Sequence, residues 1–308
     1  MKRSVLGLFV IVASEIGMLL KVEPFWSWHT PIAWTGYILL VDGIVYRRRG
    51  SSWLSDAPKE FALLAVVSFP LWLVFEFYNL FIRNWHYINL PESDFGRDVG
   101  YAWAFATIWP AVFETADLVA SLRHRGRLWR DAAPASVDPN RGSAAPALRR
   151  LSGWGVASVV IGVALLIWPL AWPSPYLAAP VWLGFVFLLD PLNALAGRQS
   201  LIGDYRRGRY IIHSHVPPTD GASIWVRPSD RLVNLMLGGL ICGFVWEFWN
   251  YWARTKWIYT VPILPNAKLF EMPLVGYLGF PAFALECFTM YVTVRLLVHR
   301  PEGRSIAL

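Results

Sequence analysis

Long apolar segments alternate with short polar segments along the whole chain. Eight of the apolar segments are long enough to cross about 30 Å of hydrocarbon as helices, at about 1.5 Å per residue. They span residues 4–22, 31–47, 60–83, 99–121, 152–174, 177–196, 230–253 and 273–297. This pattern predicts an all-α, polytopic membrane protein with about eight transmembrane helices.

The first apolar segment resembles a signal peptide because it begins Met1-Lys2-Arg3. However, Glu15 interrupts its apolar stretch, and no clean small-residue cleavage pattern follows. We therefore expect a retained first helix.

Two segments of the sequence recur in the two halves of the chain. Phe75-Glu76-Phe77-Tyr78-Asn79 precedes Trp85 and Tyr87, and Trp246-Glu247-Phe248-Trp249-Asn250 precedes Trp257 and Tyr259, at a nearly constant offset. A second set recurs at a smaller offset and comprises Trp34 and Trp182, Gly36 and Gly184, Asp42 and Asp190, Ser52 and Ser200, and Asp56 and Asp204. Such self-similarity is typical of an internal duplication.

The duplication predicts two parallel four-helix repeats. The first membrane repeat is expected at residues 1–122, a cytoplasmic linker at 123–150, and the second membrane repeat at 151–308, with a cytoplasmic insertion near 205–228. The insertion accounts for the change of offset between the two sets of matches.

Composition and charge agree with a membrane protein. Hydrophobic residues make up 56% of the chain and charged residues 16%. If the amino terminus is cytoplasmic, 22 of the 28 Lys and Arg residues fall in inside segments, as the positive-inside rule predicts. We therefore expect a multi-pass protein of the cell inner membrane with both termini cytoplasmic. The net charge of +7 then reflects topology and not nucleic-acid binding.

Acidic residues inside apolar segments are the main candidates for function, because placing them in hydrocarbon costs free energy. Glu76 with Asn79, and Glu247 with Asn250, are spaced so that each pair shares one helical face. A carboxylic acid held by an amide in a dry environment is a possible proton donor. The alternative is that each acid only joins neighbouring helices by hydrogen bonds.

A second pair of acids follows prolines in the next span of each half. Glu114 comes after Pro110, and Glu286 comes after Pro281. A proline inside a span frees a backbone carbonyl and bends the helix, which opens space for polar groups. We predict that Glu76 faces Glu114 and that Glu247 faces Glu286, so that these four acids are the candidate catalytic residues.

Tryptophan is abundant, with 18 residues, and several flank the acids. Aromatic faces attract cations by about 2 kcal/mol or more when desolvated. Acids among aromatic rings would suit a carbocation, although interfacial belts and core packing also explain many tryptophans. The predicted substrate-binding residues are Asn250, Asn79, Trp246, Trp249, Trp257, Tyr259, Trp85 and Trp109.

Several chemistries have no sequence support. The chain has no Asp-rich diphosphate motif, P-loop or dinucleotide fingerprint, and its six histidines form no metal-binding box. The two cysteines lie within predicted spans and indicate neither a disulfide nor zinc. We therefore expect no metal and no cofactor.

The repeated segments resemble the W-D-…-W-[WF]-[NDY] segment of heterodimer-type lycopene cyclase domains, which are small integral-membrane carotenoid cyclases. Trp246-Glu247, Trp257 and Tyr259 carry the resemblance, and Gly276 through Glu286 lies where the family has Pro-Leu-Glu-Glu. The chain differs in having Glu for Asp in both copies and a single Glu286 for the paired acids. The family unit also usually has three spans, against the four expected here.

This resemblance covers about 50 residues of each half, and its motifs are short. It implies metal-free, proton-initiated cyclisation of an isoprenoid, an isomerase reaction in which membrane acids donate and accept protons. The expected partners are a hydrophobic isoprenoid or lipid substrate and membrane lipids, with the oligomeric state left open. A proton-coupled transporter or lipid-binding carrier is the main alternative, since parallel repeats with midplane acids also serve transport. A scaffold or assembly factor is a third.

Overall fold

The computed structural model describes residues 2–123, 150–206, 210–212, 224–226 and 228–298, which are mostly helical. The longer helices are α1 (Lys2–Leu19), α2 (Phe25–Arg49), α4 (Pro58–Ile82), α5 (Asp94–Ala106), α6 (Ile108–Arg123), α7 (Gly153–Ala171), α8 (Ala178–Leu195), α10 (Pro228–Trp252) and α11 (Gly279–Leu297). Short helices are α3 (Trp53–Asp56), α9 (Leu201–Arg206) and the 3₁₀ helix η1 (Leu274–Leu278).

Among the described residues, three pairs of short antiparallel strands connect the helices. They are β1 (Trp85–Ile88) with β4 (Lys256–Tyr259), β2 (Tyr210–Ile212) with β3 (Ile224–Val226), and β5 (Lys268–Leu269) with β6 (Met272–Pro273). The β2–β3 pair falls in the predicted insertion near 205–228, of which the structure describes only part. The predicted linker at 123–150 lies almost entirely outside the described residues.

Each of the eight predicted spans contains a long helix, and α5 and α6 share the fourth one. Among the described residues, six segments are long and apolar enough to cross a membrane: Pro58–Ile82, Asp94–Arg123, Gly153–Ala171, Ala178–Leu195, Ser229–Trp252 and Leu274–Leu297. The protein is therefore a membrane protein. Helices α1 and α2 are not among these six segments, so the predicted number of eight spans is not confirmed; α1 contains the charged residues Lys2, Arg3 and Glu15, and α2 contains His29 and Asp42.

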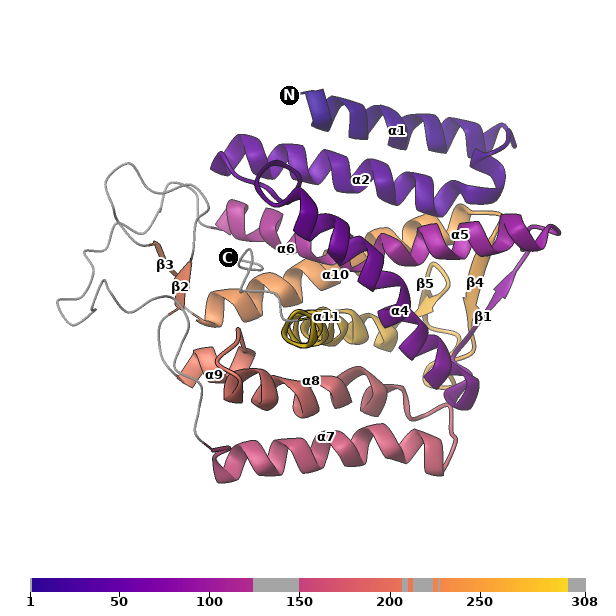
Figure 1. Cartoon of the computed structure of the whole chain (residues 1–308). Coiled ribbons are helices and arrows are strands. Elements are labelled where there is room, and N and C mark those ends of the chain that lie inside the picture. Colours follow the sequence, from indigo (N-terminus) through magenta and orange to yellow (C-terminus); the bar gives the residue numbers. More distant parts are fainter. Residues whose placement is uncertain (1, 124–149, 207–209, 213–223, 227, 299–308) are drawn as a thin grey trace.

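Most of the helices lie side by side in one stack. The order through the stack is α1, α2, α6, α10, α11, α8 and α7, and each helix packs against the next (Figure 1). Helix α4 crosses the others obliquely and packs against α5, α6, α7 and α8 (Figure 1). The core is therefore formed between α2, α4, α6, α8, α10 and α11.

Helix α10 occupies the middle of the stack because it carries glycines on two faces. A side chain at Gly238 would collide with Ala116 of α6, and one at Gly239 would collide with Phe280 of α11. Small residues of this kind let helix backbones approach closely inside a membrane. The position of α10 brings its carboxyl end next to β4 and the cavity described below.

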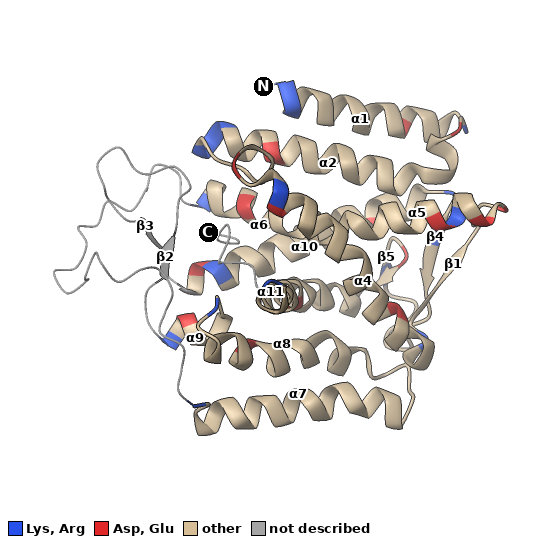
Figure 2. Ribbon diagram, in the orientation of Figure 1, with Lys and Arg blue, Asp and Glu red and all other residues tan. Residues whose placement is uncertain are grey.

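Charged residues gather at the two ends of the stack. Figure 2 shows basic residues at the amino end of α1, the carboxyl ends of α2 and α6, and the amino end of α10, all on one side. We call this side the basic end. The β1–β4 pair lies at the opposite side, which we call the strand end (Figure 1). The helices thus present a largely uncharged middle zone, as a bilayer requires.

The matched acids near the basic end make matching hydrogen bonds. Asp42 accepts a bond from the backbone N–H of Leu54 at 2.9 Å, and Asp190 accepts one from the backbone N–H of Ile202 at 2.9 Å. In the same way, the N–H groups of Ser52 and Ser200 donate to Asp56 and Asp204. Asp42 is also ion-paired with Arg3. Both aspartates therefore hold the chain where it leaves a long helix, which agrees with a capping role.

Candidate functional site

The candidate site begins with two asparagines that tie helices to strands. Asn79, near the end of α4, donates to the backbone carbonyl of Trp85 at 2.8 Å and accepts from its N–H at 3.2 Å. Asn250, near the end of α10, does the same with Trp257, at 2.8 and 2.9 Å. Each amide thereby fixes the start of a strand relative to the acid that precedes it on the helix.

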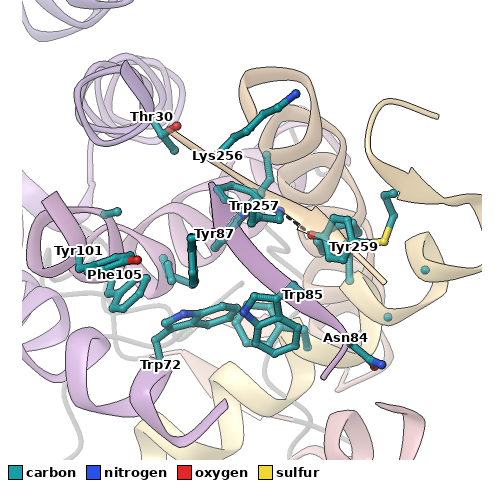
Figure 3. A pocket seen from close by; sticks show the side chains of 18 of the residues that line it. Thr30, Trp72, Asn84, Trp85, Tyr87, Tyr101, Phe105, Lys256, Trp257 and Tyr259 are labelled. Atoms are coloured by element: carbon teal, nitrogen blue, oxygen red, sulfur yellow. Dashed lines mark hydrogen bonds between the residues drawn. The ribbon is translucent and has the colours of Figure 1, made fainter. Parts of the chain in front are cut away.

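The alternating geometry of the strands then places four aromatic residues on one face. Successive side chains in a strand point to opposite sides, so Trp85 and Tyr87 share one face of β1, as do Trp257 and Tyr259 in β4. Trp85 is paired with Tyr259 and Tyr87 with Trp257 across the strands. All four rings line the same cavity, and Figure 3 shows them projecting into it.

The pairing register of β1 and β4 is symmetric: replacing each residue by its equivalent in the other strand gives the same set of residue pairs. Residues 85 and 87 correspond to 257 and 259 in the repeated sequence, and the pair Trp85–Tyr259 becomes Trp257–Tyr87 under that exchange. The central pair, His86 and Ile258, maps onto itself. The two matched sequence segments therefore meet in space and share one site.

Each repeated glutamate is hydrogen-bonded to a tyrosine of the adjacent strand. The hydroxyl of Tyr87 donates to Oε1 of Glu76 at 2.5 Å, and the hydroxyl of Tyr259 donates to Oε1 of Glu247 at 2.7 Å. We call these two pairs the Tyr–Glu pairs. They explain why the sequence repeats an acid and a tyrosine at nearly the same spacing, since the intervening turn brings strand and helix together.

The tyrosine hydroxyls remain protonated in this environment. Burial raises the pKa of both Tyr87 and Tyr259 well above the ordinary value of about 10, and the adjacent glutamate of each pair raises it further. Each phenol is therefore a neutral group that can both donate and accept a hydrogen bond. Such a group can pass a proton between the carboxyl behind it and a molecule in the cavity.

The cavity has a volume of about 420 Å³, within the usual range for small-molecule sites. Its lining is dominated by aromatic and aliphatic side chains and includes no Asp or Glu among the described residues. The two charged lining residues are already ion-paired, Arg97 with Asp94 at 2.7 Å and Lys256 with Glu271 at 2.6 Å. Seven tryptophans contribute to the wall: Trp28, Trp34, Trp72, Trp85, Trp182, Trp246 and Trp257.

Four of the eight predicted substrate-binding residues line this cavity, namely Trp246, Trp257, Tyr259 and Trp85. The other four are engaged elsewhere. The two asparagines bond strand backbone, the indole N–H of Trp109 donates to the carbonyl of Cys287 at 3.0 Å, and that of Trp249 donates to Glu15 at 2.7 Å. Sequence spacing placed them near the acids but did not reveal these competing partners.

The four predicted catalytic acids occupy two kinds of environment. Glu114 and Glu286 are fully buried among the helices, and Glu286 accepts a bond from the backbone N–H of Phe185 at 3.2 Å. Glu76 and Glu247 instead reach toward the strands and bond their tyrosines, a contact that the sequence did not predict. The face-to-face arrangement of Glu76 with Glu114 and of Glu247 with Glu286 stays a prediction.

Sequence reasoning also missed several cavity residues. Trp34 and Trp182 were recognised only as a matched pair, yet both line the wall. Tyr101 lines it as well, and so does Trp72, which the sequence placed beside the acids but not among the binding residues; its indole N–H donates to Glu76 at 2.8 Å. The spacing of one helical turn between Trp72 and Glu76 could have predicted this contact, since residues so spaced are neighbours on a helix.

The fold and the site define a helical membrane protein with an aromatic cavity at the strand end of the helix stack and two Tyr–Glu pairs behind its wall. Within the described part of the chain, no cluster of three or more His, Cys, Asp or Glu side chains could hold a metal ion. No protein family matches the chain, and comparison with curated proteins and with solved structures finds no match in either.

Proposed function

We propose that this protein binds an isoprenoid in the aromatic cavity and rearranges it by proton transfer, as a metal-independent cyclase or isomerase. The observation that carries the proposal is the presence of two Tyr–Glu pairs whose phenols line one aromatic cavity. The resemblance to lycopene cyclase domains points to the same class of reaction. The substrate class is a linear polyene or prenyl chain, which suits a wall with no exposed carboxylate among the described residues.

The proposed reaction begins with proton transfer to a double bond of the substrate. A carboxyl group of one Tyr–Glu pair gives its proton to the phenol oxygen, while the phenol passes its own proton to the substrate. The π electrons of the double bond form the new C–H bond and leave a carbocation on the neighbouring carbon. A second double bond attacks that carbon and closes a ring, and loss of a proton restores a neutral alkene.

The aromatic wall supports this chemistry because a carbocation needs stabilisation without a nucleophile nearby. Tryptophan rings attract cations through their π faces. Trp246 makes ring contacts with both Trp34 and Trp72 at the cavity, with a centroid separation of 5.8 Å in each case. Such rings stabilise positive charge but do not trap it as a covalent adduct.

The proposal includes the finer architecture of two parallel four-helix repeats in the inner membrane. The matching hydrogen bonds of the two aspartates and the two asparagines support the repeats, as does the exchangeable register of β1 and β4. The basic end is assigned to the cytoplasm by the positive-inside rule. The cavity would then open near the outer surface.

The proposal is tested with purified protein in lipid nanodiscs, supplied with lycopene or all-trans-geranylgeraniol in D₂O. The wild-type protein is expected to convert the substrate into an isomer in which one hydrogen atom is replaced by deuterium. Glu247→Gln should lose at least about a hundredfold in rate, since it removes the titratable proton but preserves shape. Glu23→Gln is the matched control, because Glu23 is exposed and does not line the cavity.

Two outcomes would overturn the enzyme proposal. If both compounds quench tryptophan fluorescence but are recovered unlabelled and unchanged, the cavity binds without chemistry. A carrier would then show uptake of the same compounds into proteoliposomes with a dependence on the proton gradient. If neither compound binds, and mass spectrometry of lipids co-purifying with the protein finds no isoprenoid, the substrate class is wrong.

A further inference from the structure

We infer that the two Tyr–Glu pairs have different roles, with Glu247 as the proton donor and Glu76 as the proton acceptor. This inference rests on the proposed function for its chemical meaning. The charge difference between the two glutamates, however, can be measured without any substrate. The two glutamates differ in the hydrogen-bond donors around each carboxyl group, in burial and in the sequence positions that produce these differences.

Glu76 is surrounded by donors. Its Oε1 atom accepts three hydrogen bonds, from the indole N–H of Trp72 at 2.8 Å, the indole N–H of Trp85 at 3.2 Å and the hydroxyl of Tyr87 at 2.5 Å. The side chain is also only partly buried. Three donors converging on one oxygen stabilise a carboxylate anion, because each N–H or O–H dipole points its positive end at the charge.

Glu247 has a poorer set of donors. Its Oε1 atom accepts the hydroxyl of Tyr259 at 2.7 Å, but its Oε2 atom is buried and has no hydrogen-bond partner among the described residues. The residue is fully buried. An anion with one unsolvated oxygen is costly in such a place, whereas a neutral carboxylic acid needs fewer partners. The geometry therefore favours a protonated Glu247.

The difference in hydrogen-bond donors between Glu76 and Glu247 follows from two positions at which the matched segments differ. The position one helical turn before the glutamate is Trp72 in the first copy and Gly243 in the second, and a side chain at Gly243 would collide with Phe280 of α11. The second copy therefore lacks the indole donor. In addition, the indole N–H of Trp257 is shared between the hydroxyl oxygen of Tyr259, at 2.8 Å, and Glu247, whereas the indole N–H of Trp85 donates to Glu76 at 3.2 Å.

The other titratable groups near each carboxyl preserve this asymmetry. Glu247 lies within electrostatic range of Tyr259, Tyr277 and Glu271, and Glu271 is ion-paired with Lys256 at 2.6 Å. Glu76 lies within range of Tyr87 and Tyr101. No described cation forms an ion pair with either of the two glutamates.

The inferred roles give a complete path for the proton. For this step the hydrogen bond between the two residues reverses. The Tyr259 hydroxyl turns its proton from Glu247 to the substrate double bond, and the Glu247 carboxyl group donates its proton to the Tyr259 oxygen, leaving a Glu247 carboxylate. After rearrangement, the substrate cation loses a proton to the oxygen of Tyr87, which gives its own proton to Glu76. The electron pair of the broken C–H bond becomes the new double bond. A proton must then return from Glu76 to Glu247, directly or through water, before the next cycle.

Infrared spectra of each variant minus the wild-type spectrum, recorded without substrate at neutral pH, test the charge states of Glu76 and Glu247. Glu247→Gln should remove one carboxylic-acid C=O band, identified by its downshift in D₂O, and Glu76→Gln should remove carboxylate stretches and no acid band. Tyr259→Phe and Tyr87→Phe are the milder variants, and each should shift the band of its own glutamate without removing it. Loss of an acid band in Glu76→Gln, or of carboxylate bands in Glu247→Gln, would overturn the inference.

Deuterium labelling gives a second, independent test. In D₂O, Glu247→Gln should return unlabelled substrate, with label incorporation reduced at least about a hundredfold. The Glu76→Gln variant should still protonate the substrate, but the resulting cation should lose a proton back to Tyr259. The recovered substrate should therefore carry deuterium, and the yield of product should fall. The opposite pattern would reverse the roles. If the wild-type protein incorporates no label but the infrared result holds, the proposed function fails and the charge asymmetry stands.

Discussion

At the residue scale, the tyrosines connect buried acids to the cavity. No described carboxylate lines the wall, and in the proposed reaction a proton from Glu247 passes through the hydroxyl of Tyr259, which bonds Glu247 and belongs to a lining residue. This arrangement keeps a charged group away from an apolar ligand and still leaves a proton available to it. The tyrosine hydroxyl therefore carries the connection, and its loss should separate chemistry from binding.

We expect Tyr259→Phe to reduce turnover of the polyene by about a hundredfold or more, because the relay atom is removed while the ring and its packing remain. Affinity for the substrate should change little. Tyr205→Phe is the matched control, since Tyr205 is exposed and does not line the cavity. Rates come from product analysis and affinity from tryptophan fluorescence. Equal turnover by both variants would contradict the relay.

The sequence identified the acids but not their partners. Glu76 and Glu247 stood out because they recur inside apolar segments, and their tyrosines recur with them. The bond between acid and tyrosine crosses the end of a helix and a turn, whose geometry no periodicity specifies. Sequence spacing was therefore able to predict the members of the site but not the bond between Glu247 and Tyr259.

At the element scale, helices were easier to predict than strands. Each long apolar segment contains a helix, because backbone groups in hydrocarbon must bond within their own segment. β1 and β4 are very short, and each pairs with a strand from the other half of the chain. Their Trp-x-Tyr alternation is visible in the sequence, yet nothing local predicts the partner. Asn79 and Asn250 supply the connection that positions them.

Replacing Asn250 by Ala should loosen β4 from α10 and misplace Tyr259, because both hydrogen bonds between the amide and Trp257 are lost. Since a typical hydrogen bond contributes about 1 kcal/mol, we expect the free energy of unfolding to fall by about 2 kcal/mol. The measurement is reversible unfolding in mixed micelles, together with turnover. Asn266→Ala is the control because Asn266 is exposed and should leave both unchanged. An Asn250→Ala protein of normal stability and rate would show that the amide does not hold the strand.

At the scale of the whole molecule, charged residues separate into two ends. The carboxyl end of α2 and the amino end of α10 lie at the same basic end as the amino end of α1 (Figure 2). Sequence counting alone indicated this separation, because helix ends alternate sides along the chain. The oblique course of α4 and the central place of α10 were not predictable, since they depend on how small and large side chains fit between helices.

Reporter fusions placed after Arg130 and after Leu308 should both report a cytoplasmic location. The reason is the excess of Lys and Arg in the segments assigned to that side. A fusion within the turn between α4 and β1, after Arg83, should report the opposite side. A periplasmic signal from either of the first two fusions would reverse or abolish the proposed topology.

The exchangeable register of β1 and β4 has a consequence for ancestry. A strand that pairs with its own repeat equivalent in this way can also pair with an identical strand from a second molecule. If the proposed repeats arose by duplication, a half-length ancestor would have built the cavity as a symmetric homodimer with two equal Tyr–Glu pairs. Fusion of the two copies would have freed each to change alone. The replacement that distinguishes Trp72 from Gly243 is a change that a homodimer, bound to alter both halves together, could not have made.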